Sequence, residues 1–435
     1  MTPEEAANVG HTGWLLICTA LVLFMTPGLA FFYGGMVRSK SVLNMMMMSF
    51  SAMGLVGVLW SIYGYSAAFG TDVGFLIGNP FENLGLTDFM TGGTPAIEGT
   101  AFAAFQATFA IITVALISGA IADRARFGSW LLFAGIWVTI VYSPVAHWVW
   151  GGGWIGEKIG ALDFAGGTVV HINSGAAALA LALVLGKRKG WPKEPMKPHN
   201  LTLVMLGAAI LWFGWFGFNA GSELAVDDIT GVMFSNTLYA TCAGMLGWLL
   251  TERLRDGNAT SLGAASGVVA GLVAITPAGA FVDTWGGLAI GFIAGIVCAL
   301  AVGLKYKFGY DDSLDVVGIH MVGGLTGALL IGFFGNLNVN DGGANGLFYG
   351  GGVDQLWRQA VGAFAVLFFS LVVTLIIGFL IQKTIGFRVS EEVEVTGIDE
   401  AEHAEVAYEF GAVRGGRTGG SVTAPATKKL EDSKS

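Results

Sequence analysis

Two histidines of the chain stand in apolar surroundings at matching spacings. In DFAGGTVVHINSG, His171 follows Asp163 by eight residues and precedes the apolar run AAALALALVLG. In DSLDVVGIHMVGGLTGAL, His320 follows Asp312 by the same eight residues. An ionisable side chain inside an apolar segment is costly, and where it occurs it marks a substrate or proton pathway. The spacing predicts one functional site built from two similar segments.

The composition indicates what kind of protein holds these residues. The 435 residues are 54% hydrophobic and 12% charged, with 67 glycines, a balance far from that of soluble domains. Cys18, Cys242 and Cys298 lie in apolar runs and leave one unpaired in any scheme, so no disulfide framework is indicated. The chain has a formal charge of −9 and no nucleic-acid motif. We expect a polytopic membrane protein without a nucleic-acid partner.

Eleven segments are apolar enough to cross a bilayer as helices, since a core about 30 Å thick needs roughly 20 residues. We expect them near residues 11–34, 41–69, 100–122, 127–149, 165–186, 199–221, 229–251, 260–278, 282–304, 314–335 and 356–383. The start MTPEEAANVGHTGW lacks the basic residues of a secretory signal, so the first segment is interpreted as a retained helix, with a cleaved signal as the alternative. The expected fold is an all-α membrane domain over residues 1–385.

Basic residues predict the orientation, because Lys and Arg in short loops stay on the cytoplasmic side. One set of alternate loops carries fifteen of them, whereas the other set carries only Lys158 and Arg358. The fifteen are Arg38, Lys40, Arg124, Arg126, Lys187, Arg188, Lys189, Lys193, Lys197, Arg253, Arg255, Lys305, Lys307, Lys383 and Arg388. We expect the N-terminus outside and the C-terminus inside.

The histidine segments fall in the fifth and tenth expected spans. Because five is odd, the two spans run in opposite directions, which is typical of an inverted repeat of five helices with a transport site near the midplane; the eleventh helix is left over. A rise of about 1.5 Å per residue places each histidine about 12 Å inward from its aspartate, so the rings end within roughly 6 Å in depth. A facing pair of imidazoles is expected.

Plainer explanations exist for each of these residues. A buried histidine can simply hydrogen-bond a neighbouring helix, although two at equivalent positions weaken that interpretation. Asp163 ahead of a helical run is a good N-cap, and capping and attraction of a cation stand as equal alternatives. Asp312, near Lys305 and Lys307, is expected to be a solvated cap or an ion-pair partner rather than a substrate ligand.

Further motifs lie along the whole apolar chain: FQATFAIITVALISGAIADRARF, AHWVWGGGW, GWFGFNAGS, DVVGIH and GIDEAEHAEVAYE. Together with DFAGGTVVHINSG they make the chain resemble the ammonium transporter family, the Amt and Mep proteins with their Rhesus relatives, over about residues 11–410. The resemblance implies a homotrimer in the plasma membrane whose protomers each enclose a pore. It implies a transporter of ammonium, not an enzyme, with no cofactor and no metal.

The resemblance also implies roles for single aromatic residues. Phe109, Trp150 and Ser222 match an external site that recruits ammonium. A cation over an aromatic face gains roughly 0.5–2 kcal/mol, and a hydroxyl can accept an N–H hydrogen bond. Phe109 and Phe218 match a gate of stacked rings, and Trp215 lines the same region. Without the motifs, any one of these aromatics would be taken for packing.

His171 and His320 match the paired histidines of the family's pore. A buried unpaired charge costs tens of kcal/mol by Born estimates, whereas a neutral amine costs only a few. Ammonia and a proton are therefore expected to pass separately, the proton along neutral imidazoles. Asp163 is also assigned to the recruitment site, because its negative charge would attract a cation.

The chain ends in an acidic, polar tail, residues 386–435, which is expected to be disordered after residue 411. In bacterial relatives the cytoplasmic face and this tail meet a PII-type nitrogen-signalling protein, and the resemblance implies that partner here. Bracing of neighbouring protomers by the tail is an equal alternative. The tail carries Ala404 where the family usually has glycine.

Three other classes of function compete with an ammonium transporter. A passive Rhesus-type channel for ammonia or carbon dioxide would not need a site that recruits a cation. A metalloenzyme is disfavoured because the helical spacing lacks the close histidine pair of a zinc site. A sensor of ammonium that signals through the tail remains an alternative.

Overall fold

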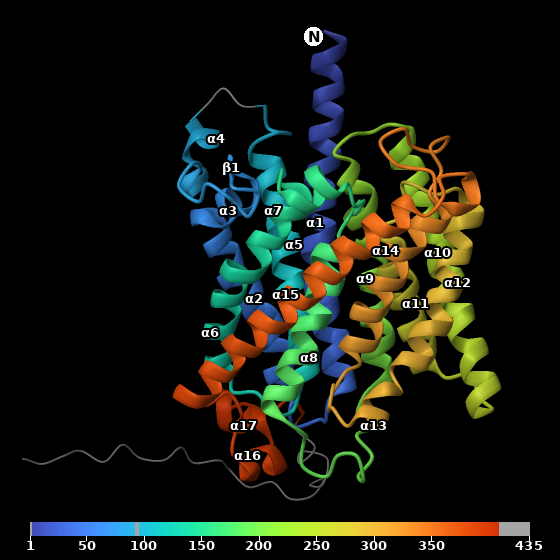
Figure 1. The fold of residues 1–435 in the computed structure, drawn as a ribbon. Helices are drawn as coiled ribbons and strands as arrows, with labels where there is room; N and C mark the ends of the chain where they lie inside the picture. Colours follow the sequence, from blue (N-terminus) through green and yellow to red (C-terminus); the bar gives the residue numbers. More distant parts are fainter. Residues whose placement is uncertain (1, 92–94, 409–435) are drawn as a thin grey trace, which may run out of the picture.

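The structure is a computed structural model that describes residues 2–91 and 95–408, without the side chains of residues 3–6. It is a bundle of long helices (Figure 1). Helix α1 starts at one end of the bundle, and the short helices α16 and α17 lie at the other. Helix α15 runs obliquely across the front in the view of Figure 1.

The helices of the first half of the chain are α1 (Pro3–Met36), α2 (Val42–Leu59), α3 (Tyr65–Phe69), α4 (Thr87–Thr91), α5 (Thr100–Ile117), α6 (Phe127–Trp137), α7 (Ser143–Trp150) and α8 (Asn173–Leu185). Those of the second half are α9 (Leu201–Ala220), α10 (Asp228–Asp256), α11 (Ser261–Ile275), α12 (Thr284–Ala301), α13 (Leu304–Phe308), α14 (Val322–Phe334), α15 (Asp354–Thr384), α16 (Glu391–Thr396) and α17 (Ile398–His403).

Shorter elements join or extend these helices. The π-helical turns are η1 (Trp60–Gly64), η4 (Val138–Tyr142), η5 (Ile155–Ile159), η6 (Gly167–Ile172) and η8 (Val317–Met321). The 3-10 turns are η2 (Leu84–Leu86), η3 (Ser118–Ile121), η7 (Gly221–Glu223) and η9 (Leu347–Tyr349). The loop after α3 also forms a small antiparallel pair, β1 (Asp72–Val73) with β2 (Ile77–Gly78), which the all-helical expectation lacked.

Within the described residues, nine helices are long and apolar enough to cross a membrane. They are Ala7–Met36, Val42–Phe69, Thr100–Ile121, Phe127–Ile159, Gly167–Leu185, Leu201–Glu223, Thr284–Phe308, Val317–Phe334 and Asp354–Thr384. The two other expected spans, 229–251 and 260–278, coincide with α10 and α11. Helix α10 is long but carries polar residues, and α11 has only 15 residues.

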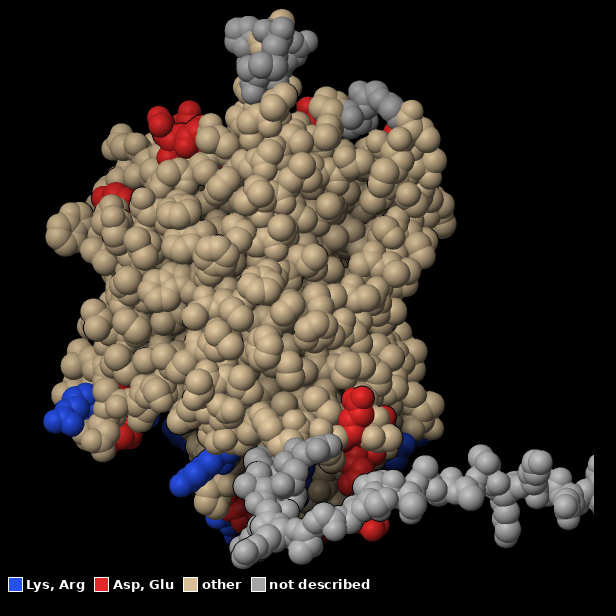
Figure 2. Space-filling view, turned by 180° about the vertical axis from the view of Figure 1, so that it is seen from behind, with Lys and Arg blue, Asp and Glu red and all other residues tan. Residues whose placement is uncertain are grey.

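Charged side chains avoid the flank of the bundle. On the face shown in Figure 2, a broad band without Asp, Glu, Lys or Arg separates the two ends of the molecule. On this face, Lys and Arg gather at the end that carries the tail, together with acidic residues, whereas the other end shows acidic residues without Lys or Arg. This is the distribution that a bilayer imposes on a spanning protein.

Helix starts follow ordinary capping chemistry. Asp227 accepts the backbone N–H of Thr230 at 3.0 Å at the start of α10, and Asn200 accepts that of Leu203 at 3.1 Å at the start of α9. These caps satisfy backbone donors that have no partner inside the helix. Helix α11 ends at Ile275, just before Thr276-Pro277, because proline has no backbone N–H with which to continue the helical hydrogen bonds.

A buried charge cluster joins loops at the end of the bundle that carries the tail. Arg188 donates to both carboxylate oxygens of Asp311 at 2.9 Å and to Asp123 at 3.1 Å. Arg124 donates to Ser313 Oγ and to the Asp311 carbonyl, both at 2.6 Å. Burial alone would raise the pKa of Asp311, but the hydrogen bonds from Arg188 outweigh it, and the pKa is lowered. The cluster is thus a set of mutually neutralised charges.

The tail folds back on the bundle. Asp399 of α17 accepts the backbone N–H of Asn44 at 2.8 Å and so caps the start of α2 from outside. Arg388 donates to the carbonyl of Leu185 at the end of α8 at 2.8 Å. Ala404 has a φ of 55°, a left-handed conformation in which glycine carries no steric penalty. The disorder expected after residue 411 lies outside the described residues.

Helices α10 and α12 pack closely because small residues face each other. A Cβ added at Gly291 of α12 would lie 2.0 Å from the carbonyl oxygen of Ala240 on α10. We expect Gly291→Ala to lower the free energy of unfolding by about 1–3 kcal/mol through this overlap. The melting temperature in detergent measures the effect. The control is Gly54→Ala on α2, where no atom lies within 4 Å; equal losses in the two variants would contradict the prediction.

Candidate functional site

Each of the two histidines lies on a π-helical turn that opens a longer helix. His171 belongs to η6, which continues into α8, and His320 belongs to η8, which continues into α14. In Figure 1 the loop after α8 lies at the end of the bundle with the tail, and the loop after α14 lies at the opposite end. The two segments therefore enter the bundle from opposite ends, as the repeat predicts.

The two histidine segments pack against each other reciprocally through glycines. A Cβ added at Gly175, four residues after His171, would lie 2.4 Å from the backbone nitrogen of Met321. A Cβ added at Gly324, four residues after His320, would lie 2.7 Å from the carbonyl oxygen of Gly167. The two equivalent glycines thus each allow a close approach to the segment that carries the other histidine.

Asp163 holds the first of these segments in place. Its Oδ1 accepts the backbone N–H groups of Gly166 and Gly167 at 3.1 and 2.7 Å, and its Oδ2 accepts those of Thr168 and Val169 at 2.9 and 3.1 Å. Both carboxylate oxygens are therefore occupied by the start of η6. Capping, one of the two alternatives, is observed; attraction of a cation by the charge stays a prediction.

Asp312 caps the second segment. Its Oδ2 accepts the backbone N–H of Val317 at 2.8 Å. The side chain is buried rather than solvated, and Lys305 pairs with Asp315 at 2.6 Å while donating to the carbonyl of Asp312 at 3.0 Å. The expected capping is confirmed. The side chain is not solvated as expected, because it is buried. Its carboxylate also lacks the expected ion pair with Lys305, because the lysine pairs with Asp315 instead.

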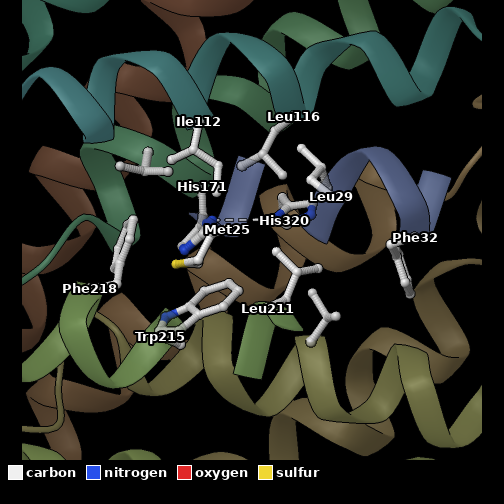
Figure 3. Close-up of a pocket in the computed structure, with 12 residues that line it drawn as sticks. Met25, Leu29, Phe32, Ile112, Leu116, His171, Leu211, Trp215, Phe218 and His320 are labelled. Carbon is white, nitrogen blue, oxygen red and sulfur yellow. Dashed lines mark hydrogen bonds between the residues drawn. The ribbon is translucent and has the colours of Figure 1, made fainter. Parts of the chain in front are cut away.

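The imidazole rings of the two segments meet. His171 Nδ1 lies 3.2 Å from His320 Nδ1, and the ring centroids are 5.3 Å apart at an interplanar angle of 27°. A hydrogen bond between these two atoms requires that one Nδ1 carries a hydrogen and that the other accepts it. Two neutral rings of different tautomers meet this requirement. Figure 3 shows this bond inside the cavity.

The cavity around the histidine pair is narrow and apolar. Only about 10 Å³ is open to the centre of a water-sized sphere, which is about what one such molecule needs. The rings of Trp215 and His171 stack with their centroids 5.4 Å apart at an angle of 23°. The indole N–H of Trp215 donates to Thr276 Oγ1 at 2.9 Å. The remaining lining is Met25, Leu29, Phe32, Ile112, Leu116, Val170, Leu211, Phe218 and Val269.

Two stacked phenyl rings close this cavity from the next one. The rings of Phe109 and Phe218 lie 4.1 Å apart at 24°. Phe218 lines the histidine cavity and Phe109 lines a second cavity toward the end where α1 starts. The structure thus brings the two expected gate residues into contact across the boundary of two cavities.

The second cavity, here called the outer cavity, holds the expected recruitment residues. It has a volume of about 160 Å³ and is lined by Phe69, Phe102, Gln106, Phe109, Trp150, Phe164, Ser222 and Leu224. The hydroxyl of Ser222 donates to the carbonyl of Phe218 at 2.9 Å, which leaves its lone pairs free to accept. Trp150 donates its indole N–H to the carbonyl of Asp163 at 2.8 Å. The carboxylate of Asp163 is not part of this lining.

Several lining residues were not predicted from the sequence. Gln106 adds a polar side chain whose Oε1 has no partner among the described atoms. Phe69 and Phe102 form an aromatic wall with ring centroids 5.0 Å apart. Gln106 lies three residues before Phe109 in a quoted motif, so helical spacing alone places it one turn away on the same face. Nothing local in the sequence points to Phe69.

Comparison with known proteins decides which family carries this arrangement. Residues 13–408 match the sequence model of the Ammonium Transporter Family. The chain belongs to the ammonium transporter family. The ammonium transporter of Mycobacterium tuberculosis is 58% identical over 93% of this chain and 91% of its own length, and that of Bacillus subtilis is 48% identical over 92% and 99%.

Solved structures of the family share the fold. The crystal structure of Candida albicans Mep2 aligns with a TM-score of 0.83 at 35% identity, covering 90% of this chain and 89% of that one. A structure named Sensor Amt Protein aligns with a TM-score of 0.85 at 27% identity, covering 92% and 100%. An ammonium transporter fold thus surrounds the paired histidines.

The four bonds to Asp163 make it a test of helix capping at the site. We expect Asp163→Ala to lower the free energy of unfolding, because each buried donor left unpaired costs about 1–3 kcal/mol. Thermal unfolding in detergent measures the loss. Asp227→Ala is the matched control, since it removes a solvent-accessible cap worth about 1 kcal/mol. A loss at Asp163 no larger than at Asp227 would contradict the capping role.

Proposed function

We propose that this ammonium transporter recruits the ammonium cation in the outer cavity, takes a proton from it, and passes ammonia and the proton separately along His171 and His320. The observation that carries the proposal is the 3.2 Å contact between the two Nδ1 atoms inside an apolar cavity. A hydrogen-bonded imidazole pair can move a proton while both rings remain neutral at rest.

The outer cavity supplies the chemistry for holding a small cation. Trp150 and Phe109 offer aromatic rings, which attract a cation by roughly 0.5–2 kcal/mol each when water is excluded. Ser222 Oγ offers lone pairs to an N–H donor. The backbone carbonyl of Asp163 accepts the indole N–H of Trp150. The carboxylate of Asp163 therefore attracts the cation through its negative charge, without contacting it.

The histidine cavity excludes the cation that the outer cavity binds. Its lining is apolar apart from two imidazoles and an indole whose N–H is already bonded. Placing a bare cation there costs tens of kcal/mol by Born estimates, while an uncharged amine costs only a few. Ammonium escapes this cost by releasing a proton. Sodium and potassium have no proton to release and are excluded.

A passive channel for ammonia or carbon dioxide is the alternative. Such a channel has no use for aromatic rings and a free hydroxyl oxygen around an outer cavity. A sensing role is the other alternative, and it would use the tail that folds back onto α2 and α8. Growth on limiting ammonium distinguishes transport from sensing alone, because a sensor does not supply nitrogen.

The electrical signature of transport tests the mechanism. In proteoliposomes we expect ammonium, but not potassium, to evoke a current. His171→Ala combined with His320→Ala is expected to abolish the current or its discrimination against potassium, because the proton path is removed. His11→Ala, at the far end of α1 outside the cavity lining, is the control. An unchanged current in the double variant would remove the histidines from the mechanism.

We further propose the membrane arrangement. Eleven spans, formed by the nine long apolar helices with α10 and α11, place the start of the chain outside and the tail in the cytoplasm of the plasma membrane. The gathering of Lys and Arg at the tail end supports this orientation. The family resemblance supports a homotrimer, which native mass spectrometry measures directly, and a PII-type protein at the cytoplasmic face.

Vesicle sidedness tests the partner and the orientation together. We expect a PII protein from the same kind of cell to bind inverted membrane vesicles that contain the transporter, because the tail and basic loops then face the solution. Right-side-out vesicles should bind none. Binding to right-side-out vesicles would contradict the orientation, and binding to neither would contradict the partner. Vesicles without the transporter are the control.

A further inference from the structure

A third buried histidine lies beside the outer cavity, outside the proposed proton path. His147 on α7 is fully buried. Its Nδ1 lies 2.9 Å from the carbonyl oxygen of Ala68 at the end of α3, and its Nε2 lies 2.8 Å from Oδ1 of Asp72 on β1. The fit between the two helix ends is close, since a Cβ added at Gly151 would lie 2.0 Å from the Ala68 oxygen.

Both atoms that face this imidazole are hydrogen-bond acceptors. A backbone carbonyl can only accept, and so can an ionised carboxylate. A neutral imidazole has one donor and one acceptor nitrogen, so it can satisfy only one of the two contacts. The pair His147 and Asp72 must therefore hold one proton more than a neutral histidine beside a carboxylate. The hydrogen bond from His147 also lowers the pKa of Asp72.

These bonds connect two parts of the lining of the outer cavity. Trp150, one turn after His147 on α7, lines the cavity, and so does Phe69, the residue after Ala68. The hairpin around Asp72 follows α3 directly and is fastened to α7 by other bonds as well, including one from the indole of Trp148 to the carbonyl of Leu76 at 2.8 Å. His147 therefore fixes the distance between the aromatic wall and the indole.

Few other charges act on the pair. Lys158 of η5 lies over Phe75 at 4.3 Å and lowers the pKa of Asp72 further, but less than His147 does. The backbone N–H of Phe75 donates to the other oxygen of Asp72 at 3.0 Å. The titratable residues on elements packed against α7 are Tyr65 of α3, Tyr142 of η4, Glu157 and Lys158 of η5, and His171 of η6.

We infer that His147 is a positioning residue of the recruitment site, and that it holds the two walls of the outer cavity together only while it carries the extra proton. The inference rests on the proposed function, because it assigns the outer cavity to ammonium. When the proton leaves at higher external pH, one of the two ring nitrogens loses its hydrogen, and its lone pair then faces the Ala68 carbonyl or the Asp72 carboxylate, so that this contact becomes repulsive. The cavity then loosens and binds ammonium less tightly.

Two substitutions of Asp72 separate the proton from the contact. In Asp72→Asn the amide N–H₂ can donate to Nε2 of a neutral His147, so the contact persists without the extra proton. In Asp72→Ala the contact is lost at every pH. Asp88→Asn is the matched control, because it removes an exposed carboxylate of the same outer loop on α4.

The measurement is the apparent KM and the maximal current of ammonium-evoked transport in proteoliposomes, at external pH values from acidic to alkaline and a fixed series of ammonium cation concentrations. For the unaltered protein and Asp88→Asn we expect KM to rise about threefold to tenfold with increasing pH, the size expected when one hydrogen bond of ordinary net strength is lost. Asp72→Asn should keep a low KM throughout, and Asp72→Ala a high one. Maximal currents should stay similar, because the histidine pore is untouched.

A KM for the unaltered protein that is as independent of pH as that of Asp72→Asn would overturn the inference. So would a KM for Asp72→Ala equal to that of the unaltered protein at low pH. If Asp72→Ala does not fold, the comparison of Asp72→Asn with the unaltered protein still decides. Absence of any ammonium-evoked current in the unaltered protein would instead refute the proposed function, which separates the two failures.

Discussion

The cost of an unpaired charge in an apolar interior governs this structure. Such a charge costs tens of kcal/mol by Born estimates before any compensation. The described interior meets this cost by pairing: Asp163 is surrounded by four backbone N–H groups, and Arg188 is matched to Asp311. The same cost that the protein avoids for its own groups is the cost that a cation meets in the histidine cavity. Under the proposed function, selectivity then needs no dedicated filter, because the apolar lining of the histidine cavity already disfavours a cation.

The π-helical turns explain how two helix starts bring two rings together. Each turn is fixed at its beginning by an aspartate, Asp163 or Asp312, and each carries its histidine near its end. A π-turn redirects side chains relative to a regular helix and is common at functional sites. The reciprocal glycine contacts then set how near the two segments lie. Ring contact is thus the product of local caps and of close packing together.

The sequence predicted those parts of this arrangement that follow from an internal repeat or from helical periodicity. The equal spacing of Asp163 to His171 and of Asp312 to His320 was enough to expect facing rings, since depth follows from helical rise. Hydropathy marked α11, although the helix is short, because its residues are almost all apolar and buried. The β1–β2 hairpin was missed because its two-residue strands are too short to show an alternating pattern. The π-turns were missed as well. The wall at Phe69 was missed because it depends on contact with the distant Phe102. The role of His147 was missed for the same reason: its motif, AHWVWGGGW, does not contain the carboxylate that it meets.

The hydrogen bonds around the two cavities restrict where movement can occur. Trp150 is fixed to the carbonyl of Asp163, and Trp215 is fixed to Thr276. Shifting the helices that carry these indoles would break buried hydrogen bonds. Phe109 and Phe218 have no such bonds, and their stacked rings lie between the outer cavity and the histidine cavity. Under the proposed function, ammonia therefore passes when these two rings turn, an exchange of rotamers that leaves the surrounding polar contacts intact.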